Sequence, residues 1–515
     1  MAFSELLLDI SILILAFTFL SFRLRSYKRQ PPLPPSPKSD PIIGHLRVLP
    51  TSDEHLVYAR LSDELHSDIV SLTVLGKTII ILNSAEAAHD LLDRRSAIYS
   101  DRSELPMISD PNLVDWSRIT GLLRYGERWR SQRRMTHASL HKTASVQFWP
   151  LIVKQSRLAL HRLLTNPNNF FKEFRRMSGT TLLSAVYGYE VTSAHDPLVE
   201  VVENALNHMC EAAVPGNFFV NIMPWLRFFP NWFPGTAWKQ TVKEWRTERD
   251  EMVDVPFNWT KNQMANGATS PSVLWALLSS LENNQDKFDS YKDEEDRIKW
   301  TVGTLFGAGA DTSAATTLVF VLAMALHPEV QARAQAEVDR VIGKDRLPEM
   351  SDRASLPYVE CVLKEVLRWQ SVVPLGIPHA CMEEDEYKGY RIPKGATVAI
   401  SNNKMVYTNP ERFNPDRFLD PTVPSAPAFG FGRRSCPGVH MAESTLFITI
   451  SSLLAAFDIR PAQDDQKKDI LPTVRMKTNA LVSHPAEFRC SIKPRCEKAI
   501  LLLDTSLSDF APEHR

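Results

Sequence analysis

The stretch FGFGRRSCPG, residues 429–438, places a single cysteine among glycines, a proline and two arginines. Its glycines let the backbone approach another group closely or adopt a positive φ. A cysteine thiolate binds soft metals and is stabilised by nearby cations and backbone N–H groups, while Arg434 offers a planar fork for a carboxylate. Haem, which carries iron and two propionates, would use both residue types; a structural cysteine in a glycine-rich turn is the alternative. The spacing favours the cofactor: Phe429-x-x-Gly432-x-Arg434-x-Cys436-x-Gly438.

A second stretch, FGAGADTSAATT, lies inside an apolar run that predicts a helix from about Arg297 to Leu326. An Asp–Thr pair in the middle of a helix is unfavourable by intrinsic propensity. Thr312 could bond back to its own helix while Asp311 faces solvent. An acid beside a hydroxyl within a hydrophobic helix is better explained by a path for protons. Asp311 and Thr312 are therefore candidate catalytic residues.

Two further motifs carry charged residues at helical spacing. LKEVLRW places Glu365 and Arg368 three residues apart on one helix face, a pair that is usually a solvated surface contact. RWRSQRR contains Trp129 and Arg133 four residues apart, which a basic amphipathic surface helix would also explain. Neither motif identifies a function by itself.

Taken together, these motifs resemble those of the cytochrome P-450 family. The 429–438 pattern is similar to the family's cysteine-ligand loop, and 308–312 is similar to its oxygen-activation motif. The resemblance implies that Cys436 is the axial ligand of the iron of haem b, within a loop that includes Phe429 and Gly438. It also implies that Thr312 holds a distal water and that Asp311 relays protons.

The same resemblance assigns partners to the other motifs. Trp129 and Arg133 would bind one haem propionate, with Arg102 and His379 as further propionate contacts. Glu365 and Arg368 would be buried and joined by a downstream arginine in NPERFNPDRF. This stretch contains two candidates, Arg412 and Arg417, and the family's pattern favours Arg417. Buried charges need such partners, so this triad would be structural.

One segment departs from the family's pattern. Between Gly395 and Phe418 the chain is shorter than in typical relatives and lacks the usual tryptophan and the His/Arg-Asp-Pro turn. This raises the question of how the segment before Arg417 packs and how well haem is retained.

The resemblance implies a haem-thiolate monooxygenase that inserts one oxygen atom from O₂ into a hydrophobic small molecule, such as a terpenoid or polyketide. The closest fit is to fungal secondary-metabolism enzymes such as the O-methylsterigmatocystin oxidoreductase group. Electrons would come from NADPH through a separate reductase, with cytochrome b5 as a further partner. The alternatives are an isomerase, dehydratase or peroxygenase on the same fold, or a non-catalytic haem binder.

Composition limits the other function classes. The 515-residue chain has a formal net charge of -1, which argues against nucleic acid as the main partner. Its six cysteines are scattered without CxxC or His-rich spacing, which disfavours structural zinc, c-type haem attachment and a disulfide framework. Most of them are expected to be small buried hydrophobes.

The N-terminus carries a membrane signal. Residues 6–22 form an apolar run near the short limit for crossing a bilayer. A cleaved signal peptide would have positive charge before the run, whereas here Glu5 precedes it and four basic residues follow it: Arg23, Arg25, Lys28 and Arg29. We therefore expect an uncleaved single-pass anchor in the endoplasmic reticulum membrane, with the catalytic domain in the cytosol.

Periodicity gives the expected elements. The stretch 68–84 is rich in β-branched residues and reads as a hairpin, whereas 150–164, 236–254 and 324–342 carry helical periodicity. The fold class is mainly α with a small β part, consistent with the cytochrome P-450 fold. The expected organisation is an anchor with a basic stop over 1–30, a proline-rich hinge over 31–50 and a haem-thiolate catalytic domain over 51–515. The aromatic stretch 216–235 is either a packed loop or a surface that dips into the bilayer.

Overall fold

The structure is a computed structural model, and the residues that it describes are 30–50, 53–191, 196–214, 217–268, 271–284, 290–401, 407–478 and 481–508. The expected membrane anchor and nearly all of its basic stop lie outside them. Two described helices, α12 (Tyr291–Leu326) and α15 (Val439–Ala456), are long and apolar enough to cross a membrane. However, 78% and 72% of their apolar windows are buried inside the protein, as in core helices.

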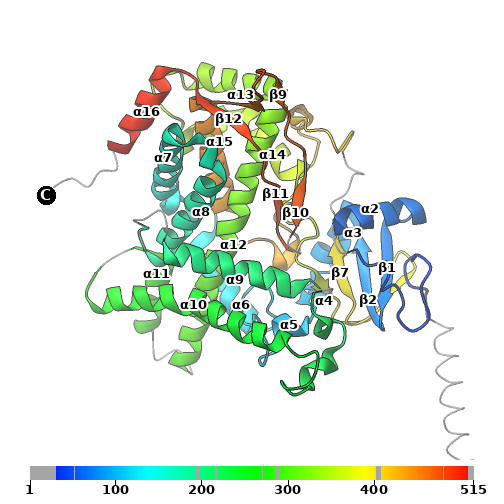
Figure 1. Cartoon of the computed structure of the whole chain (residues 1–515). Coiled ribbons are helices and arrows are strands. Elements are labelled where there is room, and N and C mark those ends of the chain that lie inside the picture. Colours follow the sequence, from blue (N-terminus) through cyan, green and yellow to red (C-terminus); the bar gives the residue numbers. More distant parts are fainter. Residues whose placement is uncertain are drawn as a thin grey trace, which may run out of the picture.

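Helices make up most of the molecule, and α12 passes through the middle of the helical body (Figure 1). This helix contacts α6, α8, α10, α11, α14 and α15. The mainly helical fold with a small sheet part is the one predicted from the sequence. The other helices are α2 (Glu54–Leu65), α3 (Ala85–Ala88), α4 (Ser96–Tyr99), α5 (Pro106–Ser109), α6 (Glu127–Leu140), α7 (Trp149–Thr165), α8 (Phe170–Tyr187), α9 (Pro197–Ala213), α10 (Trp238–Ala265), α11 (Val273–Glu282), α13 (Pro328–Val341), α14 (Pro357–Trp369) and α16 (Glu497–Ser508).

The ends of α12 follow from local sequence. The Ser290 hydroxyl accepts from the Asp293 N–H group, so the helix begins several residues before the apolar run. It ends at Leu326, and α13 begins with Pro328 at its first position. The helical periodicity expected over 324–342 therefore spans the end of one helix and the start of the next, with a break at His327.

A five-stranded sheet forms a second part beside the helices, at the right of Figure 1. Its order is β1 (Ile69–Val74), β2 (Lys77–Leu82), β7 (Thr397–Ile400), β4 (His379–Ala380) and β3 (Asp101–Arg102). The predicted 68–84 hairpin is confirmed as the β1–β2 pair. The antiparallel β3–β4 pairing sets Arg102 directly opposite His379. The sheet thus brings together residues from the first and last thirds of the chain.

Three smaller sheets complete the β part. They are formed by β5 (Asp385–Tyr387) with β6 (Tyr390–Ile392), by β8 (Phe457–Gln463) with β9 (Asp469–Ile470) and β12 (Cys490–Pro494), and by β10 (Met476–Thr478) with β11 (Ser483–Pro485). The β10–β11 pair contacts the central helix, because β11 packs against α12.

The proline-rich segment lies along the sheet. Ser71 of β1 donates its N–H to the Pro35 carbonyl at 2.9 Å and its hydroxyl to the Pro34 carbonyl at 2.6 Å. Farther along the chain, the Arg391 N–H donates to the Pro32 carbonyl at 2.8 Å. Main-chain hydrogen bonds therefore tie residues 32–35 to the folded body of the protein.

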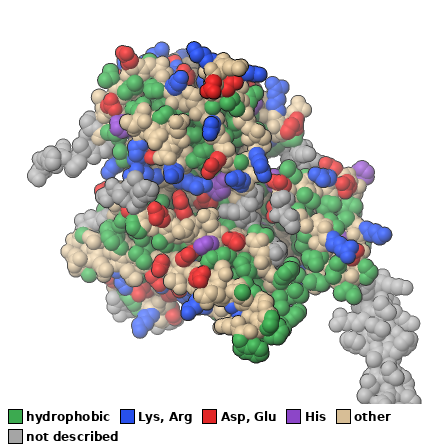
Figure 2. Space-filling model, in the orientation of Figure 1, with side chains coloured by type: hydrophobic (Ala, Val, Ile, Leu, Met, Phe, Trp, Pro, Cys, Tyr) green, Lys and Arg blue, Asp and Glu red, His purple; other side chains and the backbone are tan. Residues whose placement is uncertain are grey.

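The aromatic stretch after α9 folds into short turns and leaves large side chains exposed. Its buried residues Val220 and Asn221 hold it against the body, because the Asn221 side chain accepts from the Met107 N–H at 2.9 Å. Figure 2 shows hydrophobic side chains gathered at the lower edge of the molecule, where this stretch lies in Figure 1. The exposed aromatic patch consists of Phe219, Trp225, Phe228, Trp232 and Phe233.

Candidate active site

The loop 429–438 is a closed turn that leads into α15. The Cys436 N–H donates to the Phe429 carbonyl at 2.8 Å, and α15 begins directly after Gly438. Gly432 has a φ of +52°, and a Cβ at this position would lie 2.2 Å from the carbonyl oxygen of Leu92. The loop is therefore seated so closely on the neighbouring turn that only glycine fits there.

The side chain of Cys436 has solvent-accessible surface, although protein atoms surround most of it. Burial raises the pKa of its thiol, while the Gly438 N–H group and the Arg133 charge act in the opposite direction. Both of these partners favour the thiolate, which is the form that binds a metal. Of the other cysteines, Cys210, Cys361, Cys381 and Cys490 are buried, and Cys496 is exposed.

Two guanidinium groups lie beside this loop, and both donate to neutral oxygens. Arg102 donates to the carbonyl groups of Gly121 and Ile377 at 2.9 and 2.5 Å. Arg434 donates from Nε to the carbonyl of Ser100 at 2.7 Å. Within the described part of the chain, no carboxylate forms an ion pair with either guanidinium.

The positive charge gathered here is therefore incompletely balanced. Burial and the charge of Arg434 lower the pKa of Arg102. Burial lowers the pKa of Arg434 to about 10, with repulsion from Arg133 adding to this and the attraction of Asp101 opposing it. Burial and the two neighbouring arginines lower the pKa of His379 to about 3, so its imidazole is neutral at pH 7. Buried cations in such a group favour the binding of an anion.

Helix α6 adds Trp129 and Arg133 to the same site. Trp129 is buried, and its ring lies 4.5 Å from Cζ of Arg434 and 6.0 Å from Cζ of Arg133. No hydrogen-bond partner of the Arg133 guanidinium is found among the described residues. The helix also carries the exposed Arg130 and Arg134, so it contributes both to the site and to a basic surface.

Asp311 and Thr312 follow one another in α12 and make contacts in different directions. Thr312 Oγ1 donates to the carbonyl of Ala308 at 2.8 Å, which is the back-bonded arrangement that the sequence left open. Asp311 Oδ2 lies 3.1 Å from Nε2 of His484, which comes from β11. The acid and the hydroxyl are therefore neighbours that bond to different groups.

The structure brings Glu365, Arg368 and Arg417 together in a buried cluster. Arg368 donates to the two carboxylate oxygens of Glu365 at 2.6 and 2.8 Å, and Arg417 donates to them from its Nε at 3.1 and 3.2 Å. The Glu365 side chain has no exposed surface, and that of Arg368 is 4% exposed. A buried carboxylate with two guanidinium partners is a structural element and not a surface ion pair.

The two arginines of NPERFNPDRF contribute in different ways. Arg412 is exposed and supplies only its main-chain carbonyl, which accepts from Arg368 at 3.1 Å. Arg417 supplies its guanidinium, which also reaches the Thr408 carbonyl at 3.0 Å. Residues 402–406 of the shortened segment lie outside the described residues, but the stretch that follows them still brings Arg417 to Glu365.

Comparison with known proteins decides the family. A family model described as Cytochrome P450 matches residues 34–490. The chain belongs to the cytochrome P450 family. Its curated relatives include a P450 monooxygenase of Armillaria gallica, 39% identical over 92% of this chain and 94% of the relative, and P450 monooxygenase 208 of Postia placenta, 38% identical over 96% of both. P450 monooxygenase claR of Ampulloclitocybe clavipes is 40% identical over 92% of this chain and 88% of the relative.

The protein is accordingly a P450 monooxygenase. P450s bind haem b and use O₂, a small-molecule substrate and electrons that NADPH supplies through a reductase. The residues described above fit this cofactor. A cysteine with thiolate-stabilising partners stands beside buried cations that have no carboxylate partner, which matches a group carrying one iron and two propionates.

Sequence analysis missed several residues that position this site. Asp101 accepts two hydrogen bonds from Arg124, at 3.1 and 2.8 Å, and thereby fixes the start of the segment that carries Arg102. Its position immediately before Arg102 was the available signal. His484 lies 173 residues from its partner Asp311, and no local pattern marks it.

Proposed function

We propose that this P450 inserts one oxygen atom into a hydrophobic small molecule of fungal secondary metabolism, such as a terpenoid or polyketide. The observation that carries the proposal is the cysteine loop beside the buried arginines, because it combines a soft metal ligand with an anion site. The fungal origin of the relatives supports the metabolic setting.

Each residue of the site has a proposed role in holding haem b. Cys436 would bind the haem iron, in a loop shaped by the Phe429 carbonyl and by the backbone of Gly438. The propionates would bind among five side chains: Arg434, Arg102, Trp129, Arg133 and His379. Bound haem with a thiolate ligand would supply the O₂ chemistry.

The catalytic roles proposed for α12 concern water and protons. Thr312 would hold a water with its hydroxyl, which can accept a hydrogen bond while it donates to Ala308. Asp311 would pass protons toward that water, since it directly precedes Thr312 in the helix and its carboxylate is partly exposed. Glu365, Arg368 and Arg417 would hold the segment before the cysteine loop in place.

The substrate class is proposed from the apolar side chains of two segments. The segment 104–122 contributes Met107, Ile108 and Val114, and α12 contributes Phe306 and Ala310, all buried. Such side chains accommodate an apolar molecule and leave its regiochemistry to detailed shape.

A basic surface that includes Arg128, Arg134 and Arg433 supports the proposal that a reductase docks here as the electron donor, with cytochrome b5 as a second donor. Part of its charge is already neutralised, since Arg128 pairs with Asp296 at 2.6 Å and Arg134 pairs with Glu127 at 2.9 Å. Arg433 donates to the Tyr125 hydroxyl. The proposed location is the endoplasmic reticulum membrane, with a single N-terminal anchor and the catalytic domain in the cytosol, supported by the apolar run 6–22 and the exposed aromatic patch.

The reduced protein with carbon monoxide tests the proposal. The wild type should give the thiolate-specific difference spectrum, and Cys436→Ala should abolish it because the ligand is gone. A normal spectrum and normal turnover in Cys436→Ala would contradict the assignment of Cys436 as the iron ligand. NADPH consumption with reductase then separates a monooxygenase from an isomerase, dehydratase or peroxygenase, which would turn over without it.

A further inference from the structure

Residues 110–123 form a strap whose later part belongs to the candidate active site. The carbonyl of Gly121 accepts from Arg102 at 2.9 Å, and the carbonyl of Leu123 accepts from Arg434 at 2.7 Å. These two guanidinium groups carry the charge that is proposed to bind the haem propionates. The position of the strap carbonyls therefore decides where that charge is held.

The earlier part of the strap is held by a buried arginine of α10. Arg249 donates from Nη1 to the carbonyl of Val114 at 2.5 Å and to the carbonyl of Asp115. The same nitrogen lies 3.5 Å from the Asp115 carboxylate, and the Arg249 side chain is only 1% exposed. Its Nε donates to Asp250 at 3.0 Å. A buried cation is costly unless it is paired in this way, so the contact fixes residues 114–115 firmly.

The strap is bonded and packed between these two held parts. Asp115 has a φ of +58°, and the N–H of the next residue, Trp116, donates to the Ile108 carbonyl at 2.6 Å. The Trp116 side chain is buried. Farther along, the Thr120 N–H donates to Oγ1 of Thr304 at 3.0 Å. A densely packed segment of this kind transmits a displacement at one end to the other.

Trp300 of α12 gives Arg249 a second connection to the strap. Its buried ring lies 5.6 Å from Cζ of Arg249 and 4.4 Å from Cζ of Arg118, which belongs to the strap. Arg118 also pairs with Asp296 of α12 at 3.4 Å. Guanidinium groups are attracted to the face of an indole, so α10, α12 and the strap are joined at this ring.

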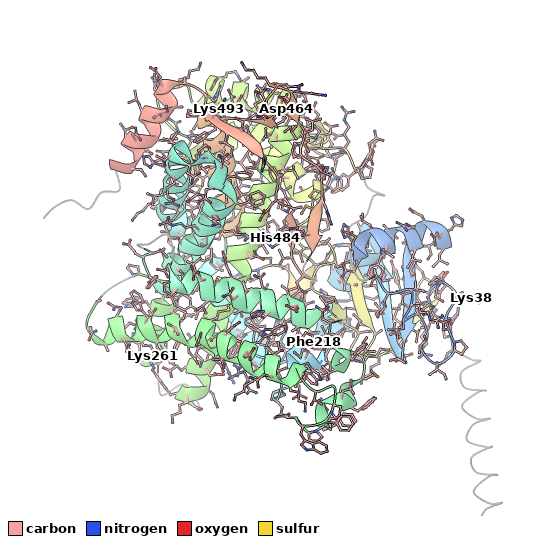
Figure 3. The ribbon with its side chains drawn as sticks, in the orientation of Figure 1. Lys38, Phe218, Lys261, Asp464, His484 and Lys493 are labelled. Carbon is pink, nitrogen blue, oxygen red and sulfur yellow. The ribbon has the colours of Figure 1, made fainter. Side chains whose placement is uncertain are left out.

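Helix α10 is itself firmly seated where it carries Arg249. Trp245, one turn earlier, is buried, and its ring stacks on His208 of α9 with centroids 4.7 Å apart. Phe218 meets the same indole edge-on at 5.5 Å, and Figure 3 shows it beside α10. Arg249 therefore projects from a fixed support.

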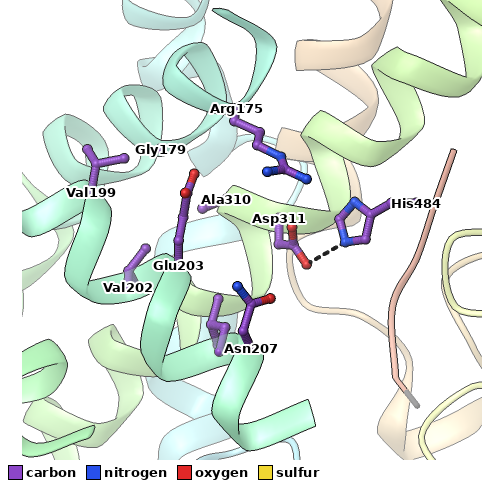
Figure 4. Close-up of a pocket in the computed structure, with 10 residues that line it drawn as sticks. Arg175, Gly179, Val199, Val202, Glu203, Asn207, Ala310, Asp311 and His484 are labelled. Carbon is purple, nitrogen blue, oxygen red and sulfur yellow. Dashed lines mark hydrogen bonds and ion pairs between the residues drawn. The ribbon is translucent and has the colours of Figure 1, made fainter. Parts of the chain in front are cut away.

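The polar recess between α8, α9, α12 and β11 is a separate feature (Figure 4). Its charged and polar lining residues are Arg175, Glu203, Asn207, Asp311 and His484. Among the described residues, neither Arg249 nor any residue of the strap lines it. The contacts described above thus hold the strap independently of the recess.

We propose that Arg249 is a positioning residue for the haem site. By fixing the strap at residues 114–115, it sets the carbonyl groups that hold Arg102 and Arg434. The positive charge held there favours the ferrous state of bound haem, because reduction adds a negative charge. This inference rests on the proposed function, which assigns the two arginines to the haem propionates.

The test measures the reduction potential of the haem-loaded, full-length protein without substrate. At the potential where the wild type is half reduced, the ferric-to-ferrous ratio of Arg249→Ala should rise roughly 3- to 10-fold, which is a fall of about 30 to 60 mV. Arg249→Lys keeps a charge near Asp115 but lacks the planar fork. This milder variant should shift the ratio in the same direction by a smaller factor.

Arg495→Ala is the matched control. Arg495 also donates to a carboxylate, that of Asp339 at 2.8 and 2.7 Å, and to two carbonyl groups, those of Leu454 and Ala455 at 3.3 and 3.2 Å. Both alanine variants should lower the urea midpoint of unfolding, but Arg495→Ala should leave the reduction potential unchanged. Equal shifts of potential in the two variants, or an unchanged potential in both Arg249 variants, would overturn the positioning role.

A second readout does not depend on haem chemistry. Hydrogen exchange of the strap amides, followed by mass spectrometry, should become roughly 3- to 10-fold faster in Arg249→Lys both at Trp116 and at Leu123. Faster exchange confined to Trp116 would show that the strap does not transmit the change, and would also overturn the proposal. A failure of the proposed function is separate from this, since it would remove the carbon monoxide spectrum of the wild type itself.

Discussion

Arg417 donates from its Nε to both carboxylate oxygens of Glu365, at 3.2 and 3.1 Å. The two residues join α14 to the segment that precedes the cysteine loop, and the Arg417 side chain is only 8% exposed. Removing one partner of a buried pair leaves the other charge uncompensated.

Arg417→Ala is therefore expected to destabilise the protein by about 3–5 kcal/mol and to reduce haem content. The matched control is Arg412→Ala, which removes an exposed side chain and should change stability by less than about 0.5 kcal/mol. Urea unfolding and the haem-to-protein absorbance ratio measure both effects. Equal losses in the two variants would contradict the assignment of Arg417.

Gly432→Ala is expected to cost at least about 2 kcal/mol, because the left-handed backbone is strained for alanine and the new methyl group would overlap the Leu92 carbonyl. Gly430→Ala is the control. It has a φ of +74° but its nearest neighbour, the Cα of Ser435, is 3.9 Å away, so only the backbone strain of about 1–2 kcal/mol applies. Unfolding midpoints that fall equally would show that the loop moves away from Leu92.

Thr312→Ala is expected to lower the amount of product formed per NADPH oxidised on the order of 10-fold, because the hydroxyl that would hold water is lost. Thr312→Ser keeps the hydroxyl and should restore most of the coupling. The measurement compares NADPH oxidised with product formed. Unchanged coupling in the alanine variant would remove Thr312 from the mechanism.

The exposed aromatic patch is expected to enter the bilayer interface. Trp232 is 81% exposed, so brominated lipids should quench its fluorescence in the full-length protein bound to vesicles. Trp232→Phe should lose much of that quenching, whereas the buried Trp300 should contribute none. If the quenching is the same in Trp232→Phe and the wild type, this side chain stays outside the membrane.

Local patterns predicted the parts of the fold that depend on neighbouring residues. The β1–β2 hairpin and the long helix around Asp311 were predictable because apolar spacing and turn residues settle them within a short window. The division at His327 was missed because helical segments lie directly on both sides of it, and only Pro328 marks the break.

Contacts between distant segments were beyond reach of such patterns. The choice of Arg417 over Arg412 needed the family's spacing, since both sit in nearly identical tetrapeptides. The carbonyl partners of Arg102 carry no sequence signal, because every residue has a carbonyl group. The contact of His484 with Asp311 depends on how the β10–β11 pair packs on α12.

The pairing of β3 with β4 joins residues that are synthesised at very different times. Arg102 leaves the ribosome early, its strand partner His379 comes much later, and Cys436 follows about 330 residues after Arg102. At about 5–20 residues per second, this interval lasts roughly 15 to 70 s. With Cys436 in its proposed role as the iron ligand, haem would be captured only when translation is nearly complete, and a nascent chain that ends before Cys436 would lack the contacts with the cofactor that stabilise the fold.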